Sequence, residues 1–149
     1  MAAMSQDRRI SAAVNIDGTP YGSLPSQHLD RPVMLLQSDP AMGKSGERFR
    51  EGNRRILENL VGAAGYRYTL RRTNHYSFSD FPLFFSPPGR WLASLGLACM
   101  HCIPPEQTYR ATGELVRAFL YGSGMLERVA ARYPSVVGGR VAKSRLSYR

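Results

Sequence analysis

The chain has 149 residues, of which 43% are hydrophobic and 21% charged, and a formal net charge of +9 at pH 7. This composition is typical of a globular domain with a real core and excludes a disordered chain. The longest apolar run, residues 91–100, is shorter than the roughly 18 residues of a membrane span. The first nine residues lack the apolar core of a secretory signal, but the sequence leaves the compartment and oligomeric state open.

The positive charge raises the question of nucleic-acid binding, because clustered cations gain affinity by releasing counterions from phosphate. The basic residues are interleaved with acidic ones as far as Glu127, and only residues 140–149 are basic without acids. No zinc-finger, helix-turn-helix or RNA-binding signature accompanies them. We therefore expect no nucleic-acid partner. The charge nevertheless leaves one alternative to an enzymatic function: a small basic, non-enzymatic protein that binds nucleic acid or an acidic partner.

The first half of the chain alternates apolar runs with one amphipathic pattern. Residues 10–16 form a β-prone run that ends in Asp-Gly. Residues 32–37 form a continuous apolar run typical of a strand buried on both faces, and residues 66–73 alternate like a strand nearer the sheet edge. Between them, residues 47–61 show helical spacing that stops at glycines. This order predicts an α/β fold of about three parallel strands with flanking helices.

The remaining elements are weaker in the sequence. We expect a short helix at residues 81–85, and a last helix at 106–121 with Leu115, Val116, Phe119 and Leu120 on its inner side. Residues 138–149 are expected to be a flexible basic tail beyond a domain of residues 1–137. The first residues indicate the end of a helix, and a sheet starting at residue 10 would leave an apolar edge uncovered. We interpret the chain as the C-terminal part of a larger domain, with an incomplete sheet.

Chemically useful side chains follow the three predicted strands. Asp17 ends the first strand, Asp39 ends the second, and His75 follows the third. A histidine held at a strand end can act as a general base, and an acid can orient its imidazole. Acid before base is the second half of the triad order in α/β-hydrolases. Asp17 and Asp39 compete for the acid's role, and each also suits a turn residue, beside Gly18 and Pro40 respectively.

No serine in the chain has glycines at both −2 and +2, as the nucleophile elbow G-x-S-x-G requires. Ser45 has Gly43 but Glu47, and Ser123 lies between adjacent glycines at the wrong spacing. An oxyanion-hole loop is absent too. We therefore predict an acid and a base without a nucleophile in this chain.

A phosphate-binding loop is a second possibility, at residues 38–45, but it is incomplete. Ser38 replaces the first glycine, and Pro40 removes an amide that would face phosphate. We therefore do not expect a nucleotide ligand.

The two cysteines form a lone C-x-x-C, Cys99 to Cys102, with no second pair to complete the four ligands of zinc. The prolines at 104 and 105 break the helix that a redox motif needs. Two buried cysteines or an incidental disulfide are expected, and no metal or other cofactor.

Residues 12–22 (AAVNIDGTPYG) and 74–80 (NHYSFSD) together resemble bacterial α/β-hydrolases of the platelet-activating-factor acetylhydrolase (isoform II) type. The resemblance spans roughly residues 2–136 and implies that Asp17 is the triad acid and His75 the base. It also implies a serine ester hydrolase that acts on small ester or lipid substrates without cofactor or metal. The family's nucleophile elbow would lie just before residue 1, so we expect the isolated chain to be inactive.

Overall fold

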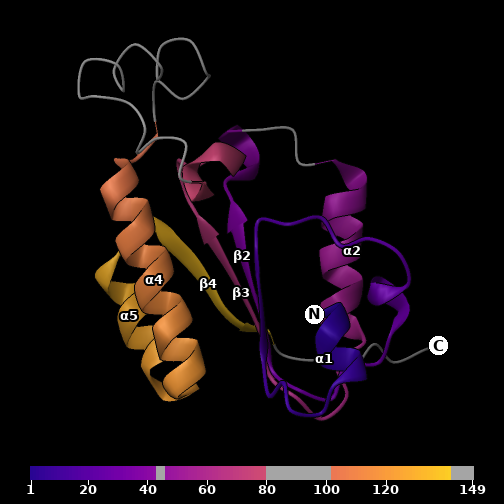
Figure 1. Cartoon of the computed structure of the whole chain (residues 1–149). Coiled ribbons are helices and arrows are strands. Elements are labelled where there is room, and N and C mark those ends of the chain that lie inside the picture. The colour runs from indigo at the N-terminus through magenta and orange to yellow at the C-terminus, as the bar shows by residue number, and fades with distance from the viewer. Residues whose placement is uncertain (43–45, 80–101, 142–149) are drawn as a thin grey trace, which may run out of the picture.

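The computed structural model describes residues 1–42, 46–79 and 102–141. Helices are labelled α, 3₁₀ turns η and strands β (Figure 1). In chain order the elements are α1 (Ala2–Gln6), β1 (Ala13–Ile16), η1 (Leu24–Ser26), β2 (Val33–Ser38), η2 (Pro40–Met42), α2 (Glu47–Glu58), β3 (Gly65–Leu70), η3 (His75–Phe78), α4 (Pro105–Tyr121), η5 (Ser123–Met125), α5 (Leu126–Arg132) and β4 (Val136–Val141).

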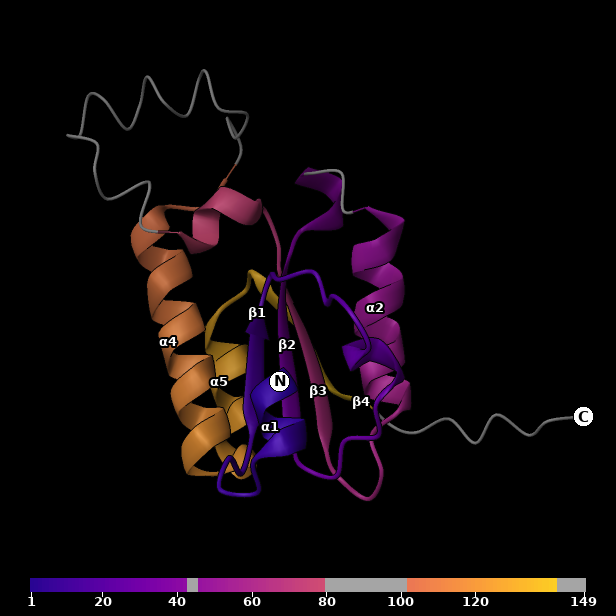
Figure 2. The same ribbon diagram turned by 45° about the vertical axis from the view of Figure 1, so that its right-hand side comes forward.

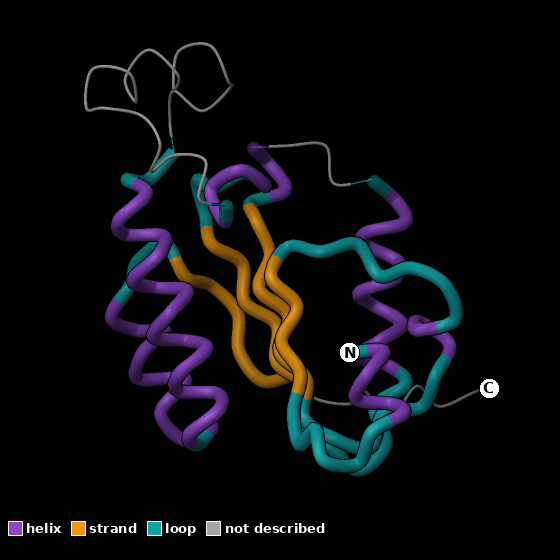
Figure 3. Tube along the Cα trace, viewed as in Figure 1, coloured by secondary structure: helices purple, strands orange, loops and turns teal. Residues whose placement is uncertain are grey.

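The strands form one four-stranded sheet in the order β1-β2-β3-β4. β1, β2 and β3 are parallel, and β4 is antiparallel to β3. Helices cover both faces, with α1 and α2 on one side and α4 and α5 on the other (Figures 1 and 2). The sheet does not close on itself (Figure 3). The predicted α/β fold of about three parallel strands with flanking helices is confirmed.

Strand β2 lies at the centre of the core, which explains its continuous apolar run. Met34 and Leu36 pack in a cluster with side chains of α4 and α5, while Val33 and Leu35 pack with side chains of α1 and α2. All four are fully buried. A parallel strand covered by helices on both faces gains burial at every position, so it does not alternate.

Helix α2 matches the predicted amphipathic segment. Ile56 and Leu57 are buried against the sheet, and Glu51 pairs on the outer face with Arg54 and Arg55. These arginines hold the pKa of Glu51 at about 2 by hydrogen bonding to its carboxylate. The chain then turns at Gly62, whose φ of 70° is readily adopted only without a Cβ.

The opposite layer differs from the prediction in one side chain. Helix α4 begins with Pro105 at a position where its missing N–H costs nothing. Leu115 and Phe119 are buried and Val116 is partly buried, as predicted, but Leu120 is 59% exposed. The reason is rotation along the helix. Leu120 lies one residue past Phe119, about 100° around the axis, and so points away from the sheet.

The C-terminal segment gives the largest correction. Residues 138–141 were predicted to begin a flexible tail, but they belong to strand β4, which pairs with all six residues of β3. As a result β3, predicted nearer the sheet edge, lies between two neighbours. The predicted helix at residues 81–85 and the rest of the predicted tail, residues 142–149, lie outside the described residues.

The N-terminal segment packs onto the same face as α2. Met4 of α1 is almost fully buried, in a cluster with Ala13, Val33 and Leu35. The guanidinium of Arg31 holds this segment by donating to the backbone carbonyls of Met4, Asp7 and Ile10. Among the described helices, none has the length and apolar character needed to cross a bilayer.

Candidate functional site

The site lies where the three parallel strands end. Because parallel strands point the same way, their C-terminal ends meet at one edge of the sheet, which is where α/β folds commonly bind ligands. Asp17 directly follows β1, Asp39 directly follows β2, and the chain after β3 enters η3 at His75. Three elements distant in sequence thus bring the predicted acids and base to one edge.

Asp17 is a buried carboxylate in an unusual backbone conformation. Its side chain is 4% exposed, and its φ of 49° lies in the left-handed region. The backbone N–H of Asp17 donates to the carbonyl of Leu36 at 2.7 Å. The carboxylate Oδ1 accepts the N–H of Ser38, also at 2.7 Å. A buried carboxylate is tolerated when hydrogen bonds replace its lost hydration, and this amide supplies one of them.

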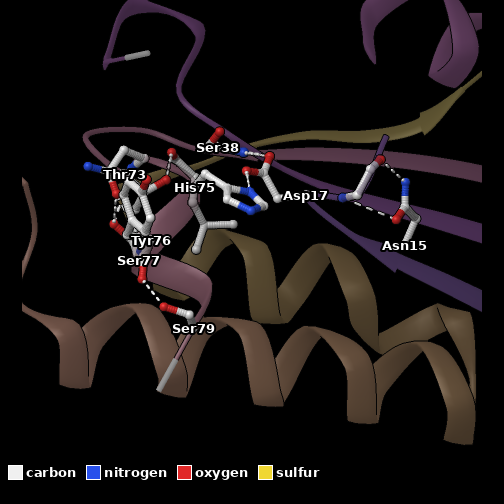
Figure 4. A network of polar contacts seen from close by, with 11 residues as sticks. Asn15, Asp17, Ser38, Thr73, His75, Tyr76, Ser77 and Ser79 are labelled. Atoms are coloured by element: carbon white, nitrogen blue, oxygen red, sulfur yellow. Dashed lines mark hydrogen bonds and ion pairs between the residues drawn. The ribbon is translucent and has the colours of Figure 1, made fainter. Parts of the chain in front are cut away.

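The second oxygen of Asp17 faces His75. Its Oδ2 lies 3.0 Å from the imidazole Nδ1, the distance of a direct hydrogen bond (Figure 4). The histidine side chain is 73% exposed, in contrast to its buried partner. Within the described residues, the other ring nitrogen, Nε2, has no hydrogen-bond partner. An imidazole held at Nδ1 by a carboxylate keeps its proton there and leaves Nε2 as the basic atom.

The turn that carries His75 is fixed by local bonds and by contacts with α4. Asn74 caps η3, because its Oδ1 accepts the N–H of Ser77 at 3.1 Å and its own N–H donates to the Ser77 hydroxyl. Tyr109 of α4 donates its hydroxyl to the carbonyl of Ser79 at 2.6 Å. Phe78 packs against the core cluster beneath α4. These contacts therefore hold the backbone that carries the exposed imidazole in one conformation.

The tyrosine next to His75 makes a ring contact with it. The rings of His75 and Tyr76 meet edge to face with centroids 6.1 Å apart, and Tyr76 itself is 58% exposed. Both side chains are therefore largely exposed to solvent.

Asp39 has a different role in the structure from Asp17. Its Oδ1 accepts the N–H of Ala41 at 3.0 Å, and its Oδ2 accepts the N–H of Arg72 at 2.8 Å. Its own N–H donates to the carbonyl of Thr73 at 3.0 Å. Both carboxylate oxygens thus bind backbone amides, one within its own turn and one in the chain leading to His75. This arrangement matches the turn interpretation of Asp39, and the structure brings Asp17, not Asp39, to the imidazole.

Two supports of Asp17 were not identified from the sequence. One is the backbone N–H of Ser38, which no side-chain motif reveals. The other is Asn15, whose side chain donates a hydrogen bond to the carbonyl of Gly18 and accepts one from the N–H of Gly18. An asparagine shortly before an Asp-Gly turn is a recognised turn-forming pattern, so this second signal was present in the sequence.

None of the serines in the described ranges hydrogen-bonds to His75. Ser77, the nearest in sequence, is engaged with Asn74.

The described residues also contain no group of three or more His, Cys, Asp or Glu side chains able to hold a metal. Cys102 is disulfide-bonded, one of the two expected states. Cys99, Lys44 and Ser45, which belong to the two incomplete motifs, lie outside the described residues.

The described residues have an α/β fold, an open sheet of three parallel strands and one antiparallel strand with helices on both faces. Among solved structures, the chain is similar to a ferulic acid esterase from Streptomyces cinnamoneus, with a TM-score of 0.69 and 24% sequence identity. The match covers 92% of this chain and 42% of that esterase, so the chain spans less than half of its length. No protein-family model and no curated protein matches the sequence.

Proposed function

We propose that this chain carries the acid and base of a serine carboxylic-ester hydrolase, Asp17 and His75, and that the nucleophilic serine belongs to a part of the domain outside this sequence. The observation that supports this most is the buried Asp17 carboxylate 3.0 Å from Nδ1 of an exposed imidazole. The similarity to an esterase of which this chain spans 42% supports the larger domain.

The proposed mechanism is acyl transfer through His75 Nε2. The serine hydroxyl attacks the ester carbonyl while Nε2 takes its proton, and the tetrahedral intermediate collapses as Nε2 returns that proton to the leaving alcohol. Water then attacks the acyl-serine while Nε2 takes a proton from it, and Nε2 passes that proton to the serine oxygen as the carboxylic acid leaves. Asp17 holds the proton on Nδ1 and stabilises the imidazolium that forms in both steps. No metal or cofactor takes part.

The exposure of His75 fits this proposal. A base buried among its own chain could not reach a serine supplied by another segment, whereas a ring 73% exposed can. The uncovered edge of β1, which pairs only with β2 among the described strands, is where further strands of the domain would add. The substrates we propose are small acyl esters, including lipid esters such as enzymes of the platelet-activating-factor acetylhydrolase (isoform II) type hydrolyse.

The isolated chain provides the first test. We expect no turnover of p-nitrophenyl acetate above that of a free imidazole, and no labelling by a serine-directed phosphonate, because no serine is activated. Turnover that is abolished by His75→Ala and blocked by the phosphonate would refute the proposal.

The second test restores the missing part. The DNA upstream of the Met1 codon is expected to encode G-x-S-x-G, in frame or after a frameshift. A protein extended by that segment should hydrolyse p-nitrophenyl acetate, and Asp17→Asn should lower kcat by about 10⁴-fold by favouring the wrong imidazole tautomer. Asp39→Asn is the matched control and should leave most of the activity. Activity independent of His75, or equal losses in the two aspartate variants, would contradict the assignment.

A further inference from the structure

One buried polar side chain on helix α2 is only partly hydrogen-bonded. Asn53 is 2% exposed and lies among residues of α2 that are buried, including Gly52 and Ile56. Its Nδ2 has no hydrogen-bond partner within the described part of the chain. A buried amide group without a partner costs free energy, and an apolar side chain of similar size would avoid that cost.

The other end of the Asn53 amide leads toward the site. Asn53 Oδ1 accepts a hydrogen bond from Asn15 Nδ2 at 3.1 Å. Asn15 in turn donates to the carbonyl of Gly18 at 2.7 Å and accepts its N–H at 3.2 Å (Figure 4). Asp17 lies inside this turn, with the left-handed φ that a residue bearing a Cβ adopts only at a cost. The bonds of Asn15 hold the turn in that conformation.

One glycine lets helix α2 approach the loop, and a second leaves room for the Asn15 side chain. A Cβ on Gly52 would lie 3.2 Å from the Pro20 ring, just beyond the turn. A Cβ on Gly18 would lie 2.5 Å from Asn15 Oδ1 and would displace the side chain that grips the turn. Helix α2 therefore approaches the acid-bearing loop at the Pro20 ring and, through Asn53, at Asn15.

We propose that Asn53 is a positioning residue: acting through Asn15 and the turn at Gly18, it sets the carboxylate of Asp17 against Nδ1 of His75. This inference rests on the proposed function, in which Asp17 selects the imidazole tautomer. Among the described residues no hydrogen bond joins Asn53 to Asp17 or His75, and its unpartnered Nδ2 is the cost of placing an acceptor oxygen at that point of the core.

The test uses the intact chain and does not depend on activity. In Asn53→Leu the acceptor is lost while the number and branching of the side-chain heavy atoms are kept. The tautomers of the neutral histidines are read from their ¹⁵N chemical shifts in alkaline solution, with the exposed His28 as internal reference. We expect the Nδ1–H to Nε2–H ratio of His75 to fall roughly fivefold, the equivalent of about one hydrogen bond, while the urea midpoint of unfolding stays at or above that of the parent protein.

Two further variants complete the design. Ile56→Val shortens a fully buried side chain three residues along the same helix, and should lower the midpoint without moving the His75 signals. Asn53→Ala removes the same acceptor with a smaller side chain and leaves the bonds of Asn15 to Gly18 in place, so it decides the question if Asn53→Leu does not fold.

The roles of Asn53 and Asp17 are tested by different variants. Parent-like His75 signals in Asn53→Leu, at any stability, would overturn the positioning role. Parent-like His75 signals in Asp17→Asn would instead overturn the acid–base pair itself.

Discussion

Gly138 is expected to be the residue on which the pairing of strand β4 most depends. Its φ is 125°, and a Cβ placed there would lie 2.1 Å from the carbonyl oxygen of Arg67 on strand β3. A Cβ placed on the next residue, Gly139, would meet no atom within 4 Å, and the backbone of Gly139 is not in the left-handed region. Two adjacent glycines in one strand therefore predict opposite responses to the same substitution.

The size of the effect follows from this geometry. Alanine at a φ essentially reserved for glycine costs about 1–3 kcal/mol. The clash must also push β4 away from β3, which breaks backbone hydrogen bonds worth about 1 kcal/mol each. Gly138→Ala should therefore lower the free energy of unfolding by about 3 kcal/mol. Gly139→Ala should leave it unchanged or raise it by about 0.5 kcal/mol, because alanine loses less backbone entropy on folding than glycine.

Urea unfolding followed by far-ultraviolet circular dichroism measures the difference. With a slope of about 2 kcal/mol per molar urea, Gly138→Ala should move the midpoint down by roughly 1.5 M and Gly139→Ala by almost nothing. Equal midpoints for the two variants would refute the reasoning, because they would mean that residues 136–141 do not pair with β3 in the register described.

Two further predictions concern the layer beneath α4. The Tyr68 hydroxyl is buried without a hydrogen-bond partner among the described residues, and burial raises its pKa. The stability linked to its protonated form is therefore full below the ordinary tyrosine value of about 10 and lost as the pH rises above it. Tyr68→Phe should cost no stability at pH 7. In urea unfolding at pH 9 to 11, the variant should lose less stability with rising pH than the parent protein. A steeper alkaline loss in the variant would contradict this. Leu115→Ala should cost about 2–5 kcal/mol because Leu115 is fully buried, whereas Leu120→Ala should cost less than about 0.5 kcal/mol; similar melting temperatures would show that α4 is rotated from the orientation described.

The local elements of this protein were available from its sequence. The continuous apolar run at β2, the helical spacing of α2 and the proline that opens α4 each depend on neighbouring residues and on one buried face, so a short window contains the whole signal. The strand-end positions of Asp17 and His75 followed from the same patterns. What a pattern cannot express is distance between segments far apart in the chain.

The tertiary structure alone decided the points that depend on such distances. Asp17 and Asp39 both follow apolar strands, and only the packing of the turns gives one carboxylate to His75 and the other to backbone amides. The sequence GGR of β4 has low strand propensity, yet it is a strand because β3 offers a free edge and Gly138 fits against a carbonyl that no side chain could approach. Hydrogen-bond partners across the fold, and not local preference, determine both outcomes.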